Sequence, residues 1–235
     1  MGRALTLPRN LGIAARWPAG IALTSWRYMW RTTPLRRREL DGTPECDGAP
    51  PLPGGVRTEG IQGPEDGSGP LFHRCYSVRI REPRLSASEL MAFIHRDPDV
   101  SAPREFATFR KTSGEAGAMR VGDEYVVRMA GPWDGPVRVV ALTDTSMRLA
   151  TLSGHLEAGQ IEFTAAGVDG GLEFRIESWA RSGDRLSNLL YTHLRMAKEI
   201  QLHMWTSFLE RVARLSGGRR AGAIVIETRR VENAA

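Results

Sequence analysis

The chain has 235 residues, of which 41% are hydrophobic and 25% are charged. This composition is typical of a globular protein and excludes a collagen-like or wholly disordered chain. No apolar run in the sequence approaches the roughly 20 residues that span a bilayer. The two cysteines, Cys46 and Cys75, do not form a CxxC motif, so we expect neither a disulfide framework nor a zinc site.

The net charge of +5 is concentrated at the N-terminus, where residues 1–39 contain eight arginines and only Glu39 as an acidic residue. Nearly all basic residues of the chain are arginines and not lysines, which is typical of a GC-rich bacterial genome. We therefore read the charge as compositional and do not expect nucleic-acid binding. A basic segment with aromatic residues still suits an anionic lipid surface or a protein partner.

Residues 1–40 are predicted to be a basic, aromatic and helical N-terminal segment, in which Pro18 can open a helix. Two interpretations remain open. The segment either docks its aromatic side chains on the main domain, or acts as an anchor or partner-binding helix. In the second case the contact would be made at a membrane surface or a protein by Trp17, Trp26, Trp30 and neighbouring arginines. No secretory signal is expected, and we predict a cytoplasmic protein that is peripheral at the membrane if the segment is an anchor.

Residues 41–70 are rich in glycine and proline and are predicted to be a linker or a wrapping arm. The main domain is expected at residues 71–218, followed by a tail at 219–235 that could add a short strand. Residues 71–80 alternate apolar and polar side chains and predict a strand, and Ser86 with Glu89 predicts a capping box before a short helix.

Beyond this helix, the residues around Phe106 and Phe109 are expected to be irregular or helical. Five strands are then predicted between Gly122 and Arg181, separated by turn-like segments. We also expect an ion pair along the first of these strands between Arg128 and the acidic residues Asp123 and Glu124. The alternation in the last two strands predicts a sheet with one apolar and one polar face.

Residues 184–216 predict one long amphipathic helix that begins at Asp184 and stops at Gly217. Its apolar stripe includes His193, Ala197, Met204 and Phe208. Antiparallel strands followed by one such helix predict an α+β fold of the helix-grip type. In this fold a curved antiparallel sheet wraps on the C-terminal helix and leaves room for a ligand between the two.

The stretch ATLSGHLEAGQIEFTAAGVDGGLEFRIESWAR and the helix LLYTHLRMAKEIQLHMWTSFLERV resemble an uncharacterised bacterial and plant family, known only as a domain of unknown function. That family is similar in turn to the START-like (SRPBCC) superfamily of lipid carriers, polyketide cyclases and pollen-allergen-type binders. The resemblance covers about residues 71–215 and implies a fold and a cavity but no catalytic residues. Ser153 and Leu156 stand where the family often has proline.

Three polar residues are the candidates for chemistry. His155 and Glu157 lie in one turn and could act as an acid/base pair at the rim of a cavity, or else simply lock the turn. His193 on the apolar helix face could bind a polar ligand group, or be a core histidine. An enzyme of the cyclase or dehydratase type would need His155 and His193 to converge on one ligand atom.

The favoured hypothesis is a binding protein for a hydrophobic small molecule of lipid, polyketide or isoprenoid type. The residues expected to contact this ligand are Phe163, Phe174, Trp179, His193, Ala197 and Met204. The alternatives are the enzyme and an adaptor acting through the N-terminal segment. Dinucleotide, P-loop, GxSxG and HExxH motifs do not occur in the sequence, so no cofactor and no metal site are predicted.

Overall fold

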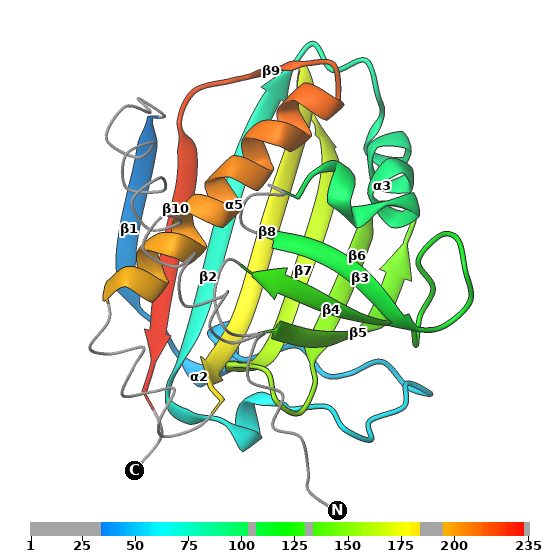
Figure 1. Ribbon diagram of the computed structural model, residues 1–235. Helices are drawn as coiled ribbons and strands as arrows, with labels where there is room; N and C mark the ends of the chain where they lie inside the picture. Colours follow the sequence, from blue (N-terminus) through cyan, green and yellow to red (C-terminus); the bar gives the residue numbers. More distant parts are fainter. Residues whose placement is uncertain (1–33, 103–106, 130–133, 184–194, 233–235) are drawn as a thin grey trace, which may run out of the picture.

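The structure is a computed structural model that describes residues 34–102, 107–129, 134–183 and 195–232. Within these residues, the long helix α5 (Arg195–Leu215) and the shorter helix α3 (Ala87–Arg96) lie against one face of a ten-stranded sheet (Figure 1). The strands are β1 (Leu35–Asp41), β2 (Ser68–Arg81), β3 (Ala107–Ser113), β4 (Glu124–Met129), β5 (Asp134–Thr143), β6 (Ser146–Thr151), β7 (Glu157–Val168), β8 (Gly171–Ser182), β9 (Arg219–Arg220) and β10 (Ile224–Val231). Three single-turn helices, α2 (Pro44–Asp47), η1 (Pro64–Asp66) and η2 (Pro98–Val100), complete the described chain.

The sheet is mixed, with the strand order β1-β10-β2-β8-β7-β6-β5-β4-β3 and with β9 paired to β2. All pairs are antiparallel except β1 and β10, which run parallel with Leu35 opposite Ile224. The strands within residues 71–218 pair antiparallel as predicted, and the parallel strand β1 at this edge was not predicted. β1 also takes up the end of the segment predicted to be helical, while residues 1–33 of that segment lie outside the described residues.

Most of the other strands lie where the sequence predicts them. The five predicted runs between Gly122 and Arg181 are β4 to β8, and the tail contributes β10. The residues around Phe109 form β3 instead of the predicted irregular or helical piece. Pairing with β4, which places Phe109 opposite Val127, supplies the hydrogen bonds of this strand, and tertiary pairing of this kind overrides a weak local preference.

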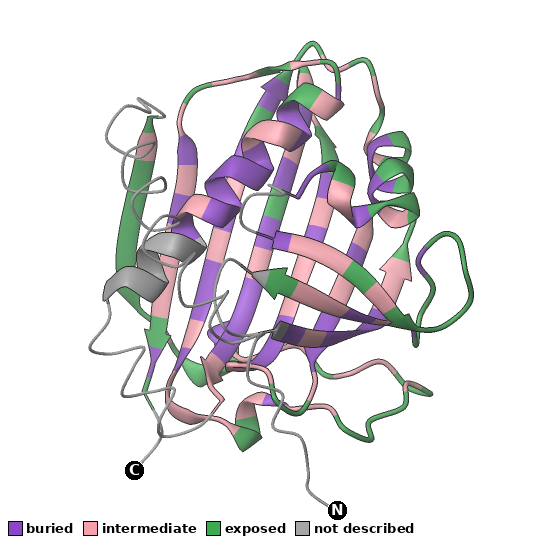
Figure 2. Ribbon diagram, viewed as in Figure 1, coloured by how far each residue is buried: buried purple, intermediate pink, exposed green. Residues whose placement is uncertain are grey.

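Successive side chains of a strand point to opposite sides, so the alternation of apolar and polar residues gives the sheet two different faces. The inner face, turned toward α5, carries Tyr76, Val78, Phe163, Phe174 and Ile176 in one buried core cluster. The sheet curls so that β3, β4 and β5 come round toward the same side as the helix (Figure 1). Buried residues lie on α5 and on the strands beneath it (Figure 2).

Helix α5 packs on the inner face through a layer of aromatic rings. The ring of Phe208 lies 5.4 Å from that of Phe163 and 6.1 Å from that of Phe174, and Trp205 contacts Phe163 edge-on at 5.6 Å. The helix ends at Leu215, and Gly217 follows with a positive φ of 74°, which matches the predicted stop. No helix in the described ranges is both long and apolar enough to span a membrane.

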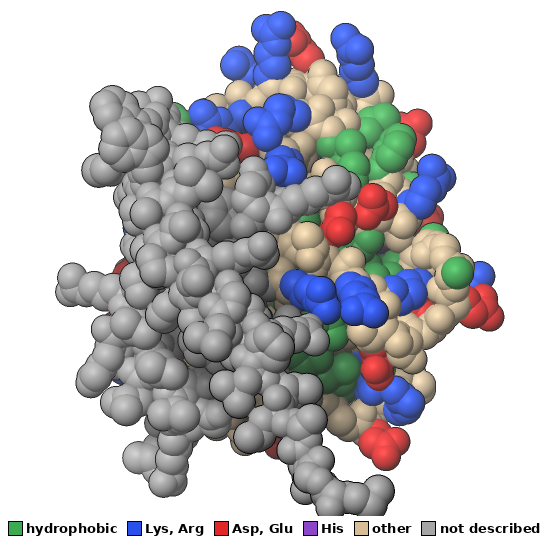
Figure 3. Space-filling model, in the orientation of Figure 1, with side chains coloured by type: hydrophobic (Ala, Val, Ile, Leu, Met, Phe, Trp, Pro, Cys, Tyr) green, Lys and Arg blue, Asp and Glu red, His purple; other side chains and the backbone are tan. Residues whose placement is uncertain are grey.

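The capping box predicted for α3 is observed: Ser86 Oγ accepts from the Glu89 N–H at 3.3 Å, and the Glu89 carboxylate accepts from the Ser86 N–H at 2.8 Å. The buried face of α3 adds Leu90, Met91 and Ile94 to the same core cluster. On the molecular face seen in Figure 3, hydrophobic, basic and acidic side chains are interspersed over the described part of the chain.

The opposite, outer face of the sheet is crossed by residues 43–62, which we call the strap. Ala49 of the strap packs against Leu71, Trp179 and Val231, which form a second, smaller buried cluster. The amide of Gln160 donates to the Pro50 carbonyl at 2.8 Å, and Ile61 forms a β-bridge with Leu152. The strap therefore covers the outer face at one end of the sheet.

Candidate functional site

Polar side chains gather on the inner face of the sheet, beside the aromatic layer. Arg74, Tyr76, Glu157 and Ser178, which we call the inner polar cluster, come from three adjacent strands, β2, β7 and β8. Arg74 and Ser178 are directly opposite each other, and Tyr76 is opposite Ile176, which in turn faces Phe163. Tyr76 is therefore level with Phe163 across the strands, and Arg74 and Ser178 are at the next inward-facing positions.

Arg74 is the charged member of this cluster, and only 5% of it is exposed. Its Nη1 lies 3.7 Å from Oε1 of Glu157, and its guanidinium stands over the ring of Phe72 at 4.6 Å from the centroid. Burial raises the pKa of Tyr76 to about 12, and the charges of Arg74 and Glu157 also act on this phenol. The phenol is therefore neutral and can donate a hydrogen bond at ordinary pH.

One member of this cluster and one residue of the aromatic layer each carry a polar group without a hydrogen-bond partner among the described residues. They are the hydroxyl of Ser178 and the indole Nε1 of Trp205, and both residues are more than nine-tenths buried. Buried polar atoms in native proteins are almost always paired, because an unpaired one costs about 1–3 kcal/mol. These two groups lie in an otherwise apolar layer, where a ligand atom could pair with them.

The residues predicted to contact a ligand divide into three groups. Phe163 and Phe174 are fully buried on the inner face, and Met204 is buried on α5 in the same core cluster. Phe163 and Phe174 have no accessible surface, so they act as packed side chains in this structure. His193 and the side chain of Ala197 lie outside the described residues.

Trp179 is on the other face of the sheet, so its assignment to the layer beneath α5 needs correction. It is an odd-numbered residue on β8, whereas Leu172, Phe174 and Ile176 are the inner residues of that strand. Its ring stacks on His73 with centroids 5.3 Å apart and packs against the strap. Burial by the strap, rather than by α5, explains why this large aromatic residue has an apolar environment.

His155 and Glu157 lie near each other but do not form an acid/base pair. The Nδ1 atom of His155 accepts a hydrogen bond from the backbone N–H of Glu157 at 2.9 Å, while the Glu157 carboxylate turns toward Arg74. Burial lowers the pKa of His155, and the nearby Glu157 charge opposes this only in part. The imidazole is therefore neutral, and its visible role is to hold the turn.

The same turn is fastened by the strap residue Gln62. Its Nε2 donates to the carbonyls of His155 and Glu157 at 3.0 and 3.1 Å, and its Oε1 accepts from the Gly154 N–H at 3.3 Å. The strap thus positions the residue that carries the carboxylate of the inner polar cluster. No periodic pattern in the glycine- and proline-rich segment indicates this role for Gln62.

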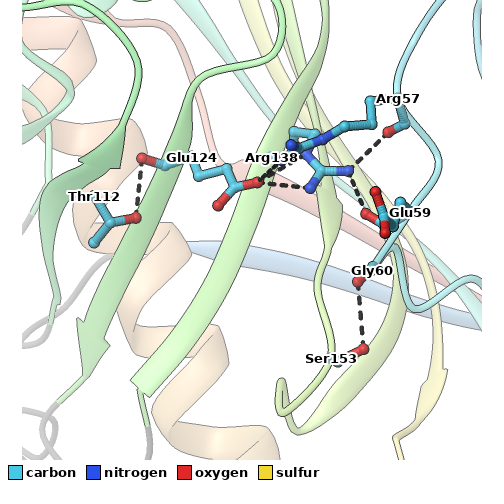
Figure 4. Close-up of polar contacts among 7 residues, drawn as sticks. All are labelled: Arg57, Glu59, Gly60, Thr112, Glu124, Arg138 and Ser153. Atoms are coloured by element: carbon cyan, nitrogen blue, oxygen red, sulfur yellow. Dashed lines mark hydrogen bonds and ion pairs between the residues drawn. The ribbon is translucent and has the colours of Figure 1, made fainter.

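The acidic residues at the start of β4 have partners other than the predicted Arg128. Asp123 pairs with Lys111 at 2.6 Å. Glu124 pairs with Arg138 and Arg57, each at 2.6 Å, and Arg138 is 97% buried. Figure 4 shows the Arg138 guanidinium between the Glu124 carboxylate and the carbonyls of the strap. These pairs hold the structure together and belong to no ligand site.

No group of three or more metal-ligating side chains occurs within the described residues. Arg74 was missed by the sequence analysis, although a signal for it exists. It has the same parity as Tyr76, Val78 and Ile80 on one strand, which places it on the apolar inner face. A charged residue at such a position is rarely tolerated without a partner, which makes it a candidate for a functional role.

Comparison with protein families matches part of this chain. The model of a family described as a domain of unknown function (DUF1990) matches residues 103–213. This segment contains β4 to β8 and most of α5, which together make the helix-grip arrangement seen here. A family without a known function assigns no roles to individual residues. A search of curated proteins gave no match.

Among solved structures, the chain is similar to protein Ms6760 from Mycobacterium smegmatis, with 13% identity, 61% of this chain and 89% of that chain covered, and a TM-score of 0.41. Ara h 8.0201 has 11% identity, with 61% of this chain and 99% of that chain covered and a TM-score of 0.40. The di-domain ARO/CYC protein StfQ from the steffimycin biosynthetic pathway has 9% identity, with 66% of this chain and 52% of that chain covered and a TM-score of 0.47. Likenesses at this level carry no inference about ligand or activity.

Proposed function

We propose that this protein binds an amphipathic small molecule between the inner face of the sheet and helix α5. The apolar part of the ligand lies against the aromatic layer at Trp205, which is 8% exposed, because Phe163 and Phe174 have no accessible surface. Its polar end, which carries a hydrogen-bond acceptor, meets the inner polar cluster. Pockets that bind small molecules commonly combine apolar walls with a few convergent polar groups of this kind.

One observation carries this proposal: the Ser178 hydroxyl, on the residue opposite Arg74, and the Trp205 Nε1–H are buried without a hydrogen-bond partner among the described residues. Trp205 contacts Phe163, and Ser178 is one register row from Phe163 on the same face. Each of these donors could pair with an acceptor atom of a ligand bound in this layer. The ligand class is therefore a lipid-like or polyketide-like molecule with an oxygen-bearing end.

A titration of the full-length protein with a naturally fluorescent polyene fatty acid tests this proposal. Removing the Ser178 hydroxyl in Ser178→Ala deletes one hydrogen bond of about 0.5–1.5 kcal/mol, so the Kd is expected to rise about 2- to 10-fold. The matched control is Ser77→Ala, which makes the same change on the adjacent strand but on the outer face. This control should leave the Kd unchanged.

Two results would contradict the proposal. One is the absence of saturable binding by the wild-type protein. The other is an equal Kd for wild type and Ser178→Ala, because a ligand that ignores this hydroxyl does not lie at the inner polar cluster. A parallel loss in Ser77→Ala would indicate a general loss of stability instead, and thermal denaturation of both variants detects that case.

A further inference from the structure

A buried histidine on the outer face joins the strap to the sheet. His73 Nδ1 lies 2.8 Å from Oδ1 of Asp47, which belongs to the strap, and His73 Nε2 lies 2.7 Å from Oε1 of Glu177 on β8. The imidazole is 94% buried and stacks on the ring of Trp179. We call Asp47, His73 and Glu177 the histidine clasp.

The geometry of the clasp defines the protonation state of the ring. An ionised carboxylate only accepts hydrogen bonds, so a ring held between two of them must donate from both nitrogens. Only the imidazolium form has two N–H donors. A neutral ring would leave one carboxylate facing a nitrogen lone pair inside a buried site, which converts an attractive contact into a repulsive one.

We propose that residues 43–50 of the strap are released from the outer face of the sheet when His73 loses its proton. In the closed state these residues are held by Asp47, whose Oδ2 also accepts from the Thr43 N–H at 2.9 Å. Arg229 on β10 contacts Asp47 at 3.2 Å and cannot by itself replace the ring, because it is partly exposed and shared with Glu227 at 3.6 Å. Loss of the His73 proton therefore weakens the attachment, because the one N–H that remains cannot serve Asp47 and Glu177 together and the uncharged ring no longer attracts the Asp47 carboxylate.

The charges around the ring favour a closed clasp at pH values below the raised pKa of His73. Burial opposes the charge on His73, but the hydrogen bonds to Glu177 and Asp47 outweigh it and raise the pKa of His73 above its ordinary value. Burial likewise opposes the charge on Asp47, and its hydrogen bonds with His73, Thr43 and Arg229 lower the pKa of this carboxyl.

The sign of the pH dependence follows from these two directions. A histidine whose pKa is raised in the folded state stabilises the closed strap at low pH, and this contribution disappears as the pH rises through the raised value. Cys75, the next outer residue on β2, does not disturb this transition, because its pKa is raised to about 11, mainly by burial. The remaining charges near Glu177 are Glu162 and Arg175, and the guanidinium keeps its charge throughout.

The other end of the strap provides an internal reference. The guanidinium of Arg138 donates to the carbonyls of Arg57 and Glu59, each at 2.7 Å, while it pairs with Glu124 (Figure 4). An arginine stays charged over the whole working range. Residues 57–59 therefore remain attached when residues 43–50 are released. Opening uncovers Trp179, Leu71 and Val231, which Ala49 covers in the closed state.

Hydrogen exchange of the full-length protein, followed by mass spectrometry between about pH 6 and about pH 9 and corrected for the intrinsic exchange rate, tests the proposal. Peptides from residues 43–50 should lose protection as the pH rises, by about tenfold or more in corrected rate, while peptides from residues 57–62 stay constant. Long-range ¹⁵N NMR should show His73 protonated on both nitrogens at about pH 6.

Two variants sharpen the test. Asp47→Asn removes one carboxylate of the clasp and should shift the loss of protection in residues 43–50 to lower pH. Glu45→Gln makes the equivalent change at an exposed residue of the same helix, α2, and should behave as wild type. Protection of residues 43–50 that does not change with pH, or a neutral His73 ring at about pH 6, would overturn the proposal.

Discussion

Replacement of Phe208 by alanine tests the contact between α5 and the sheet most severely. The side chain is 1% exposed, and its ring lies within 5.4 to 6.1 Å of the rings of Phe163, Phe174 and Trp205. Truncation of a buried phenylalanine to alanine costs about 3–5 kcal/mol through lost transfer energy and the cavity left behind. This range already includes the loss of contacts between aromatic rings. We therefore expect the free energy of unfolding to decrease by about 4 kcal/mol.

Urea denaturation followed by far-ultraviolet circular dichroism measures this change. A domain with a stability of about 5–15 kcal/mol still folds after such a loss, so both states can be observed. The matched control is Phe93→Ala on α3, where 43% of the side chain is exposed and a loss below about 1 kcal/mol is expected. If Phe208→Ala cost no more than Phe93→Ala, helix α5 would not pack on the inner face as described.

Two further outcomes follow from the site. Gly159→Ala should prevent folding or destabilise the protein severely, because a Cβ at this position would overlap the carbonyl oxygen of Trp179; soluble yield and thermal denaturation check this. The pKa of His155 is lowered by burial, so its neutral ring contributes stability that is lost as the pH falls below the ordinary histidine value of about 6.5. The difference in unfolding free energy between wild type and His155→Asn should therefore shrink on acidification, and a difference that grows would contradict the neutral assignment.

The inner face of the sheet was predictable because alternation is a local property of the sequence. Phe163, Phe174 and Ile176 alternate with charged residues, and all three are buried toward α5 as that pattern indicates. The same parity rule, applied strictly, places Trp179 on the outer face and Arg74 on the inner face. The assignment of Trp179 failed because this residue was weighed by its size before its position in the strand, and Arg74 was not considered as a site residue.

The outer layer was not predictable in the same way. Asp47 and Gln62 lie in a glycine- and proline-rich segment without periodicity, and their partners, His73 and the turn at His155, are far away in sequence. Strand β1, with its run of arginines, has no apolar alternation and owes its existence to parallel pairing with β10. Long-range contacts of this kind leave no signal in a single sequence.

Native mass spectrometry of the full-length protein, purified without denaturants, tests the central claim most directly. If the layer between α5 and the inner face holds an amphipathic ligand, a population with added mass should appear, disappear on mild unfolding, and be reduced in Ser178→Ala but not in Ser77→Ala. If the wild-type protein shows only the mass of the bare chain, and still does so after incubation with the polyene fatty acid, the ligand site beneath α5 does not exist.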